Sequence, residues 1–125
     1  VGVDAIKDSV ARARPPNAPA DVHGTAFPSG HAAYSVIYAW LAITVVVRLR
    51  PGLTNGTAVL AFGIALTALI GLTRIYLGVH YMSDVVSGWG LGVSAFSACA
   101  MVAILATHLR QNARNARAHP SGDPA

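Results

Sequence analysis

His80 and Asp84 form the residue pair in this chain that is best suited to nucleophilic chemistry. They are four positions apart, so they would share a face if this segment is helical. A carboxylate bonded to one imidazole nitrogen fixes the tautomer of the ring and leaves the other nitrogen free as a nucleophile. Arg74 lies at the end of a long apolar run, where its charge is costly without an anionic partner or water. The alternative is an Arg–Asp pair that closes a helix junction, with His80 as an ordinary interfacial residue.

A second cluster, Pro28-Ser29-Gly30-His31, stands directly before another apolar run. A helix that begins here would present unpaired N–H groups and the positive end of its dipole, which attract anions. Ser29 can cap this helix or donate its hydroxyl to a phosphate oxygen, and Gly30 lets the backbone approach a ligand closely. If the apolar run spans a membrane, His31 would lie at the membrane surface, where it could supply a proton. The alternative is an ordinary helix start with an incidental histidine.

Two cations near the beginning of the chain, Lys7 and Arg14, are seven residues apart. Residues Asp4 to Arg14 are typical of a short helix that ends before Pro15-Pro16. Two helical turns cover about 7.2 residues, so both cations would project from one face. They could clamp an anion, with a planar fork from Arg and a point charge from Lys. Taken alone, a solvated amphipathic helix explains the pair at least as well.

Three long apolar runs must position these clusters. Charged residues make up 11% of the 125-residue chain and hydrophobic residues 54%, whereas a soluble domain carries about 25% charged residues. A membrane-spanning helix needs roughly 20 apolar residues. A soluble bundle of three buried helices is the alternative, but the runs have almost no polar stripe. The sequence therefore predicts an all-α membrane bundle with three transmembrane helices, at about residues 31–48, 56–74 and 83–108.

Positive charge predicts the orientation of these helices. Arginines follow the first and third runs and lie on one side of the membrane, and such segments stay in the cytoplasm. They are Arg48, Arg50, Arg110, Arg114 and Arg117. Residues 1–30 and 74–84 would then face outward, with all three clusters. The net charge of +4 forms no basic stripe interleaved with aromatic residues, so we expect no nucleic-acid partner.

Together the three clusters resemble the type 2 phosphatidic-acid phosphatase superfamily, which also includes the vanadium haloperoxidases. The signature of that family is K-x6-R-P, then P-S-G-H, then S-R-x5-H-x3-D. Order and spacing agree here, and the one departure is Thr73 in place of the more usual serine, which keeps the hydroxyl. The matching residues are Lys7, Arg14, Pro15, Pro28, Ser29, Gly30, His31, Arg74, His80 and Asp84.

The resemblance implies hydrolysis of a lipid phosphate or diphosphate monoester through a phosphohistidine, without cofactor or metal. His80 would attack phosphorus, Asp84 would orient it, and His31 would protonate the leaving group and then activate water. Fixed cations would stabilise the charge, and the histidines lack the companions that a metal site needs. The residues expected to bind the phosphoryl oxygens are Lys7, Arg14, Ser29, Gly30 and Arg74.

Membrane members of this family usually have six helices, with the motifs in the last three. By that comparison the first three are absent here, and the opening at Val1 without an initiator Met also suggests a fragment. We expect a catalytic core over residues 1–110 and a disordered cytoplasmic tail over residues 111–125.

The expected substrate is an amphiphile in a bacterial cell membrane, with an outward-facing active site. Polyprenyl diphosphate (such as undecaprenyl diphosphate), phosphatidic acid and phosphatidylglycerol phosphate all qualify. Heavy use of Arg over Lys with abundant Ala suggests a GC-rich genome, which favours the first. The alternatives are a lipid phosphotransferase, a vanadium-type haloperoxidase, and an inactive membrane fragment or scaffold. The sequence leaves the oligomeric state open.

Overall fold

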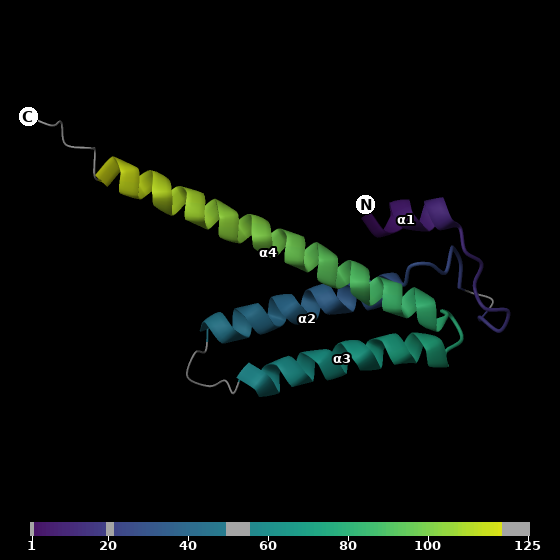
Figure 1. The fold of residues 1–125 in the computed structure, drawn as a ribbon. Coiled ribbons are helices and arrows are strands. Elements are labelled where there is room, and N and C mark those ends of the chain that lie inside the picture. The colour runs from purple at the N-terminus through teal and green to yellow at the C-terminus, as the bar shows by residue number, and fades with distance from the viewer. Residues whose placement is uncertain (1, 20–21, 50–55, 119–125) are drawn as a thin grey trace, which may run out of the picture. The chain divides into compact units, whose positions relative to one another are not determined.

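The computed structural model describes residues 2–19, 22–49 and 56–118, and these contain helices and loops but no strand (Figure 1). The chain divides into two compact units, Val1–Ala95 and Phe96–Ala125. The second unit, as far as it is described, is the C-terminal part of the last helix. The helices are α1 (Gly2–Val10), α2 (Gly30–Leu49), α3 (Gly56–Tyr76) and α4 (Met82–Ala118).

Three of these helices are long and apolar enough to cross a membrane: Gly30–Leu49, Gly56–Tyr76 and Met82–Arg117. Their most apolar windows have mean hydropathies of 1.7, 2.0 and 1.9. The expected all-α fold with three such helices is confirmed. The bounds of α2 and α3 agree with the sequence prediction to within two residues.

The predicted disorder after residue 110 is wrong as far as the structure describes the tail. Residues 111–118 continue α4, which ends at Ala118, and residues 119–125 lie outside the described part of the chain. Arg, Gln and Ala are strong helix formers. They also extend a helix that is already nucleated, so each added residue gains a hydrogen bond without a new nucleation cost.

The predicted helix from Asp4 to Arg14 is too long, because α1 ends at Val10. Ala11 has a φ of 46°, and its N–H donates to the carbonyl of Lys7 at 2.9 Å. A residue in this left-handed conformation is a common helix terminus. Arg14 therefore lies in a loop, and the argument that it shares a helical face with Lys7 is wrong.

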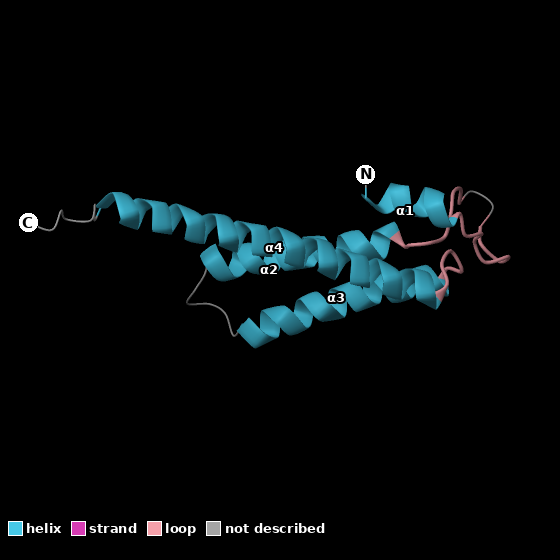
Figure 2. Ribbon diagram, turned by 45° about the horizontal axis from the view of Figure 1, so that its top comes forward, coloured by secondary structure: helices cyan, strands magenta, loops and turns pink. Residues whose placement is uncertain are grey.

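Close contacts between α4 and the start of α2 bring together two of the chain segments that carry the polar clusters. A Cβ at Gly88 would lie 2.5 Å from the carbonyl oxygen of Ser29, and a Cβ at Gly92 would lie 2.6 Å from that of Ala33. Small residues at such positions let two membrane helices approach backbone to backbone. The loops before α2 and before α4 consequently lie at the same end of the helices (Figure 2).

Candidate active site

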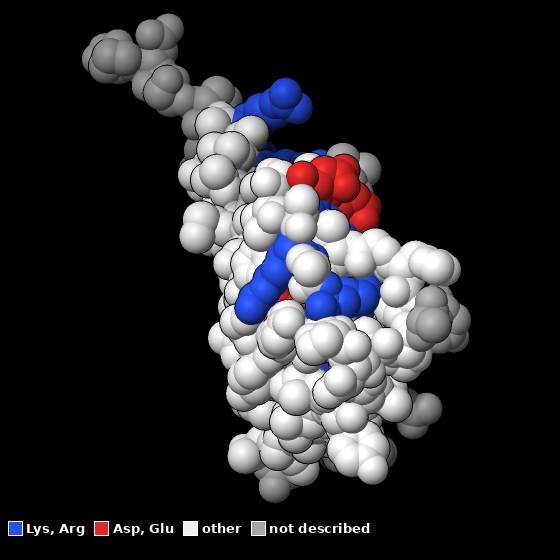
Figure 3. All heavy atoms as spheres, turned by 90° about the vertical axis from the view of Figure 1, so that its right-hand side faces the viewer, with Lys and Arg blue, Asp and Glu red and all other residues white. Residues whose placement is uncertain are grey.

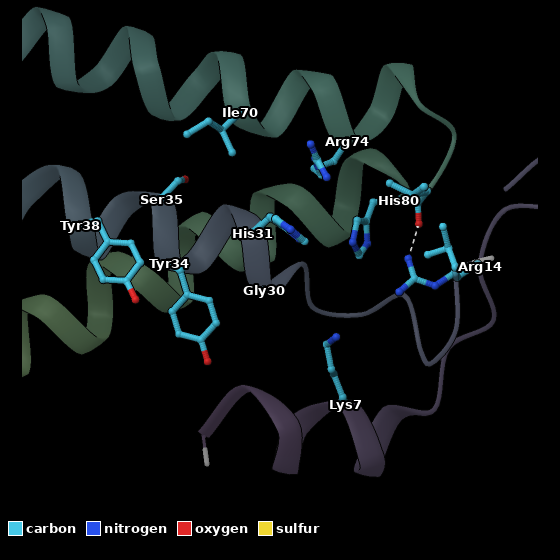
Figure 4. Close-up of a pocket in the computed structure, with 12 residues that line it drawn as sticks. Lys7, Arg14, Gly30, His31, Tyr34, Ser35, Tyr38, Ile70, Arg74 and His80 are labelled. Atoms are coloured by element: carbon cyan, nitrogen blue, oxygen red, sulfur yellow. Dashed lines mark hydrogen bonds between the residues drawn. The ribbon is translucent and has the colours of Figure 1, made fainter. Parts of the chain in front are cut away.

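A pocket of about 760 Å³ opens at the end of the helices where these loops meet. Figure 3 shows that Lys and Arg side chains gather on this face around a few acidic atoms. The pocket is lined by six of the eight residues selected from the sequence, which come from α1, α2, α3 and two loops (Figure 4). These six are Lys7, Arg14, Gly30, His31, Arg74 and His80. The other two, Ser29 and Asp84, are fully buried and do not line it.

The two histidines reach the pocket from different elements. His31 lies in the first turn of α2 and is exposed, whereas His80 lies in the loop between α3 and α4 and is only 5% exposed. In Figure 4 both rings point into the same space, and Lys7 of α1 points toward it from the opposite side. An exposed and a buried imidazole thus face one cavity that also contains cationic side chains.

Ser29 has the capping role that was one of its two predicted uses. Its Oγ accepts a hydrogen bond from the N–H of Ala32 at 3.4 Å, which is the geometry of an N-cap before α2. Its own N–H donates to the carbonyl of Asp84 at 2.9 Å. The start of α2 is therefore tied directly to the first turn of α4.

Arg14 is fixed by three backbone carbonyls. Its Nε donates to Gly24 at 3.0 Å, its Nη1 to Val79 at 2.9 Å and its Nη2 to His23 at 3.1 Å. Figure 4 marks the bond to Val79. Because carbonyl oxygens are neutral, these bonds hold the guanidinium without cancelling its charge. Arg14 thus connects the loop before α2 to the residue that precedes His80.

The electrostatic surroundings of His80 favour its neutral form. Burial, followed by the positive charge of Arg14, lowers the pKa of His80 below that of an ordinary histidine. A hydrogen bond with the backbone of Ala26 and the charge of Asp84 oppose this shift, and Lys7 adds to it. The net effect keeps the ring uncharged near neutral pH, which is the state that a nucleophilic imidazole requires.

Asp84 lies near His80 without a direct hydrogen bond to it. The distance from Oδ2 of Asp84 to Nδ1 of His80 is 3.7 Å, longer than a hydrogen bond. Oδ2 instead accepts the N–H of Tyr81 at 2.8 Å. Asp84 is the third residue of α4 and Tyr81 precedes that helix, so this is the reach-back bond of a helix cap. His80 is outside α4, and a turn rather than a shared helical face brings the pair together.

Two buried nitrogen donors at the site have no hydrogen-bond partner among the described residues. They are Nε of Arg74 and Nδ1 of His80. Buried polar atoms are nearly always satisfied in folded proteins. Their lack of a protein partner fits a site that completes its bonding with a ligand or water.

Sequence reasoning missed Arg12. Its Nη1 donates to Oδ1 of Asp84 at 2.8 Å and to Oγ of Ser83 at 2.6 Å, and its guanidinium lies 4.4 Å from the centre of the Tyr81 ring. The only available signal was indirect. A carboxylate buried at a helix junction needs a positive partner, but nothing in the spacing identifies which arginine supplies it.

Comparison with known proteins gives a family for the chain. The PAP2 superfamily model matches residues 1–112. Phosphatidylglycerophosphatase B of Bacillus subtilis (strain 168) is 34% identical over 94 residues, which are 73% of this chain and 46% of that protein. A crystal structure described as the first transmembrane PAP2 type phosphatidylglycerolphosphate phosphatase, also from Bacillus subtilis, aligns with a TM-score of 0.72 at 30% identity. That alignment covers 77% of this chain and 49% of the other.

Because the match extends over most of the chain, the chain belongs to the PAP2 superfamily. The helices that can cross a membrane and the structural likeness make its fold that of a transmembrane member of this family. The resemblance found in the three clusters is thereby confirmed. The chain spans about half the length of the relatives that it matches.

Proposed function

We propose that this chain carries the catalytic site of a membrane-embedded phosphatase, which hydrolyses a lipid phosphate or diphosphate monoester through a phosphohistidine on His80. The observation that carries this proposal is the pocket itself. A buried imidazole kept neutral and an exposed imidazole face one cavity, together with three cationic side chains. Membership of a phosphatase family and the phosphatase names of both relatives support it.

The cations would bind the phosphoryl group before reaction. Lys7, Arg14 and Arg74 line the pocket from three separate segments and surround the space between the histidines. The buried Nε of Arg74 supplies a donor that no described residue uses. Gly30, at the start of α2, adds a backbone N–H at the positive end of a helix dipole. Preorganised donors of this kind stabilise the charge that develops on the transferring group.

In the first step, the imidazole nitrogen of His80 that is remote from Asp84 attacks phosphorus. The new N–P bond forms as the P–O bond to the lipid breaks, and the electron pair leaves with the lipid oxygen. His31 donates a proton to that oxygen, which releases a lipid alcohol or, from a diphosphate, a lipid monophosphate. Asp84 balances the positive charge that the phosphorylated ring acquires.

In the second step, water attacks the phosphohistidine. His31, now neutral, accepts the proton of the water as the new O–P bond forms and the N–P bond breaks. Inorganic phosphate leaves, and both histidines return to their starting states. An exposed position for His31 and a buried one for His80 suit these two roles, since only the proton shuttle must meet water.

The pocket suits a lipid substrate. Beyond the histidines it is lined by Tyr34 and Tyr38 of α2 and by Ile70 of α3, which belong to helices long enough to cross a membrane. The phosphate would stay among the cations while the lipid tail remains in the bilayer. We propose phosphatidylglycerol phosphate first, because both relatives are named for it, ahead of polyprenyl diphosphate and phosphatidic acid. We also propose an outward-facing site, because Arg48 lies at the opposite end of α2.

The test is phosphate release from these three lipids in detergent with EDTA, using the chain within its full-length protein. The His80→Ala variant is compared with His108→Ala, which removes an exposed histidine of the second unit. The reaction is also quenched with alkali, which preserves phosphohistidine, after brief exposure to substrate labelled in its phosphate. We expect release that survives EDTA, a labelled protein, and loss of both in His80→Ala alone. Release that persists without His80, or that EDTA abolishes, would refute the mechanism.

A further inference from the structure

Asp84 is a fully buried carboxylate whose two oxygens have different partners. Oδ2 accepts the N–H of Tyr81 and lies 3.7 Å from Nδ1 of His80, whereas Oδ1 accepts Nη1 of Arg12 at 2.8 Å. A carboxylate at this depth is costly unless it is both paired and hydrogen-bonded. The contact with Arg12 therefore offsets the negative charge of Asp84 beside His80.

Arg12 is held firmly although its side chain is 38% exposed. The same Nη1 also donates to Oγ of Ser83, and the guanidinium stacks over the ring of Tyr81. The carbonyl of Arg12 accepts the N–H of Ala26 at 2.8 Å. Planar stacking and a fork of donors are properties of arginine that lysine lacks. From the loop after α1, Arg12 thus contacts three of the four consecutive positions 81–84, where α4 begins: Tyr81, Ser83 and Asp84.

Arg12 differs in kind from the cations that face the substrate. Lys7, Arg14 and Arg74 line the pocket, and Arg12 does not. Its charge acts on Asp84, and Asp84 in turn acts on His80. A residue in this position influences the nucleophile without touching the phosphate.

We propose that Arg12 is a positioning residue of this site, which fixes the Asp84 carboxylate beside His80 and offsets its charge so that the imidazole stays neutral and nucleophilic. This inference rests on the phosphohistidine function proposed above. Without Arg12, His80 would be the nearest group able to neutralise Asp84, and protonation of His80 would then be favoured. The carboxylate would also lose the contact that holds Oδ1.

The direction of the resulting pH effect follows from the groups around His80. Lys7 of α1 and Arg14 of the loop favour its neutral form, Asp84 of α4 favours its charged form, and His31 and Arg74 line the same pocket. Removing Arg12 strengthens the influence of Asp84 and leaves the others in place, so the pKa of His80 rises. Because protonated His80 is not a nucleophile, activity falls on acidification. This acid limb of the pH–activity profile therefore moves to higher pH when Arg12 is removed.

The experiment measures kcat and KM against pH for Arg12→Met, Arg12→Lys and the control Arg114→Met in the full-length protein. Arg114 is an exposed arginine of the second unit. We expect Arg12→Met to lower kcat by about tenfold to a hundredfold, the cost of a misplaced reacting group. KM should change little, and the acid limb should move to higher pH. Arg12→Lys should restore the position of the limb and only part of kcat, and Arg114→Met should match the parent protein.

Two outcomes would overturn the proposal. One is a variant that loses thermal stability while kcat per folded molecule and the acid limb stay unchanged, which would make Arg12 merely structural. The other is a rise in KM alone, as expected for a phosphate ligand. Alkali-quenched labelling of His80 in the parent protein separates this failure from that of the proposed function. If His80 is labelled and the limb does not move, only the role of Arg12 fails, whereas an unlabelled His80 refutes both.

Discussion

Replacement of Gly88 by alanine tests whether close packing of α4 on the start of α2 sets the geometry of the site. The added Cβ would lie 2.5 Å from the carbonyl oxygen of Ser29, 2.9 Å from the Cβ of Ala32 and 3.3 Å from the N of Ala33. Two of these three atoms belong to the backbone, so no side-chain rotation relieves them. The two helices must move apart.

The size of this movement gives the expected effect. Separation to about 3.4 Å, an ordinary carbon–oxygen contact, requires a shift of about 0.9 Å. The shift acts on Ser29, which is two residues from His31 and bonded to Asp84. Misplacement of reacting groups by about 1 Å can lower a rate roughly a hundredfold. Overpacking of this kind also costs about 1–3 kcal/mol of stability.

Gly90 provides a matched control, because it lies on the same helix and a Cβ there would have nothing within 4 Å. Both substitutions gain the same helix propensity, about 1 kcal/mol, so their difference isolates the packing. We expect Gly88→Ala to lower kcat about a hundredfold and to lower the midpoint of thermal inactivation. Gly90→Ala should keep full activity with an equal or higher midpoint. If both variants are equally active, the contact does not position the site and the reasoning is refuted.

Two further predictions concern single charges. Burial and the charge of Arg14 lower the pKa of His80 from the ordinary value of 6.5. The neutral ring therefore contributes stability that is present above this pH and lost below it. The thermal midpoint should fall more steeply on acidification in the parent protein than in His80→Gln, and equal slopes would contradict this. Lys7→Ala should lower kcat/KM at least about tenfold, since a charged hydrogen bond contributes about 1.5–3 kcal/mol. The exposed neighbour Asp8, changed to alanine, should leave kcat/KM within about twofold, and an equal loss in both would contradict a phosphate contact.

The membrane helices were predictable because their signal is local and continuous. Each apolar run is long enough to identify one helix without knowledge of its neighbours, and the structure places α2 and α3 within two residues of prediction. The ends of α1 and α4 were not predictable in this way. The first depends on one left-handed residue, Ala11, and the second on polar residues that are compatible with either a helix or a tail.

The candidate site was likewise predictable only where its signal is local in the sequence. The motif spacings selected six residues that line one pocket, because each motif is short and its residues keep their order wherever the segment lies. What the spacings did not contain is how the motifs are joined. Arg14 is fixed by carbonyls of two different loops, and the contact between Arg12 and Asp84 joins positions 72 residues apart.

These joining contacts set the charges and the positions of the side chains that line the pocket. Three cationic side chains line one pocket with two histidines, and they repel each histidine when it is protonated. Contacts outside the pocket must offset this repulsion. Arg14 is held by neutral carbonyls, which keep its charge available, while Arg12 holds the buried Asp84 that compensates charge on His80. Both arginines come from the loop after α1. Arg14 reaches Val79, which precedes His80, and Arg12 reaches Asp84 in the first turn of α4. The loop after α1 therefore sets the charge balance around His80, the proposed nucleophile, while α3 and α4 fix the two ends of the segment that carries it.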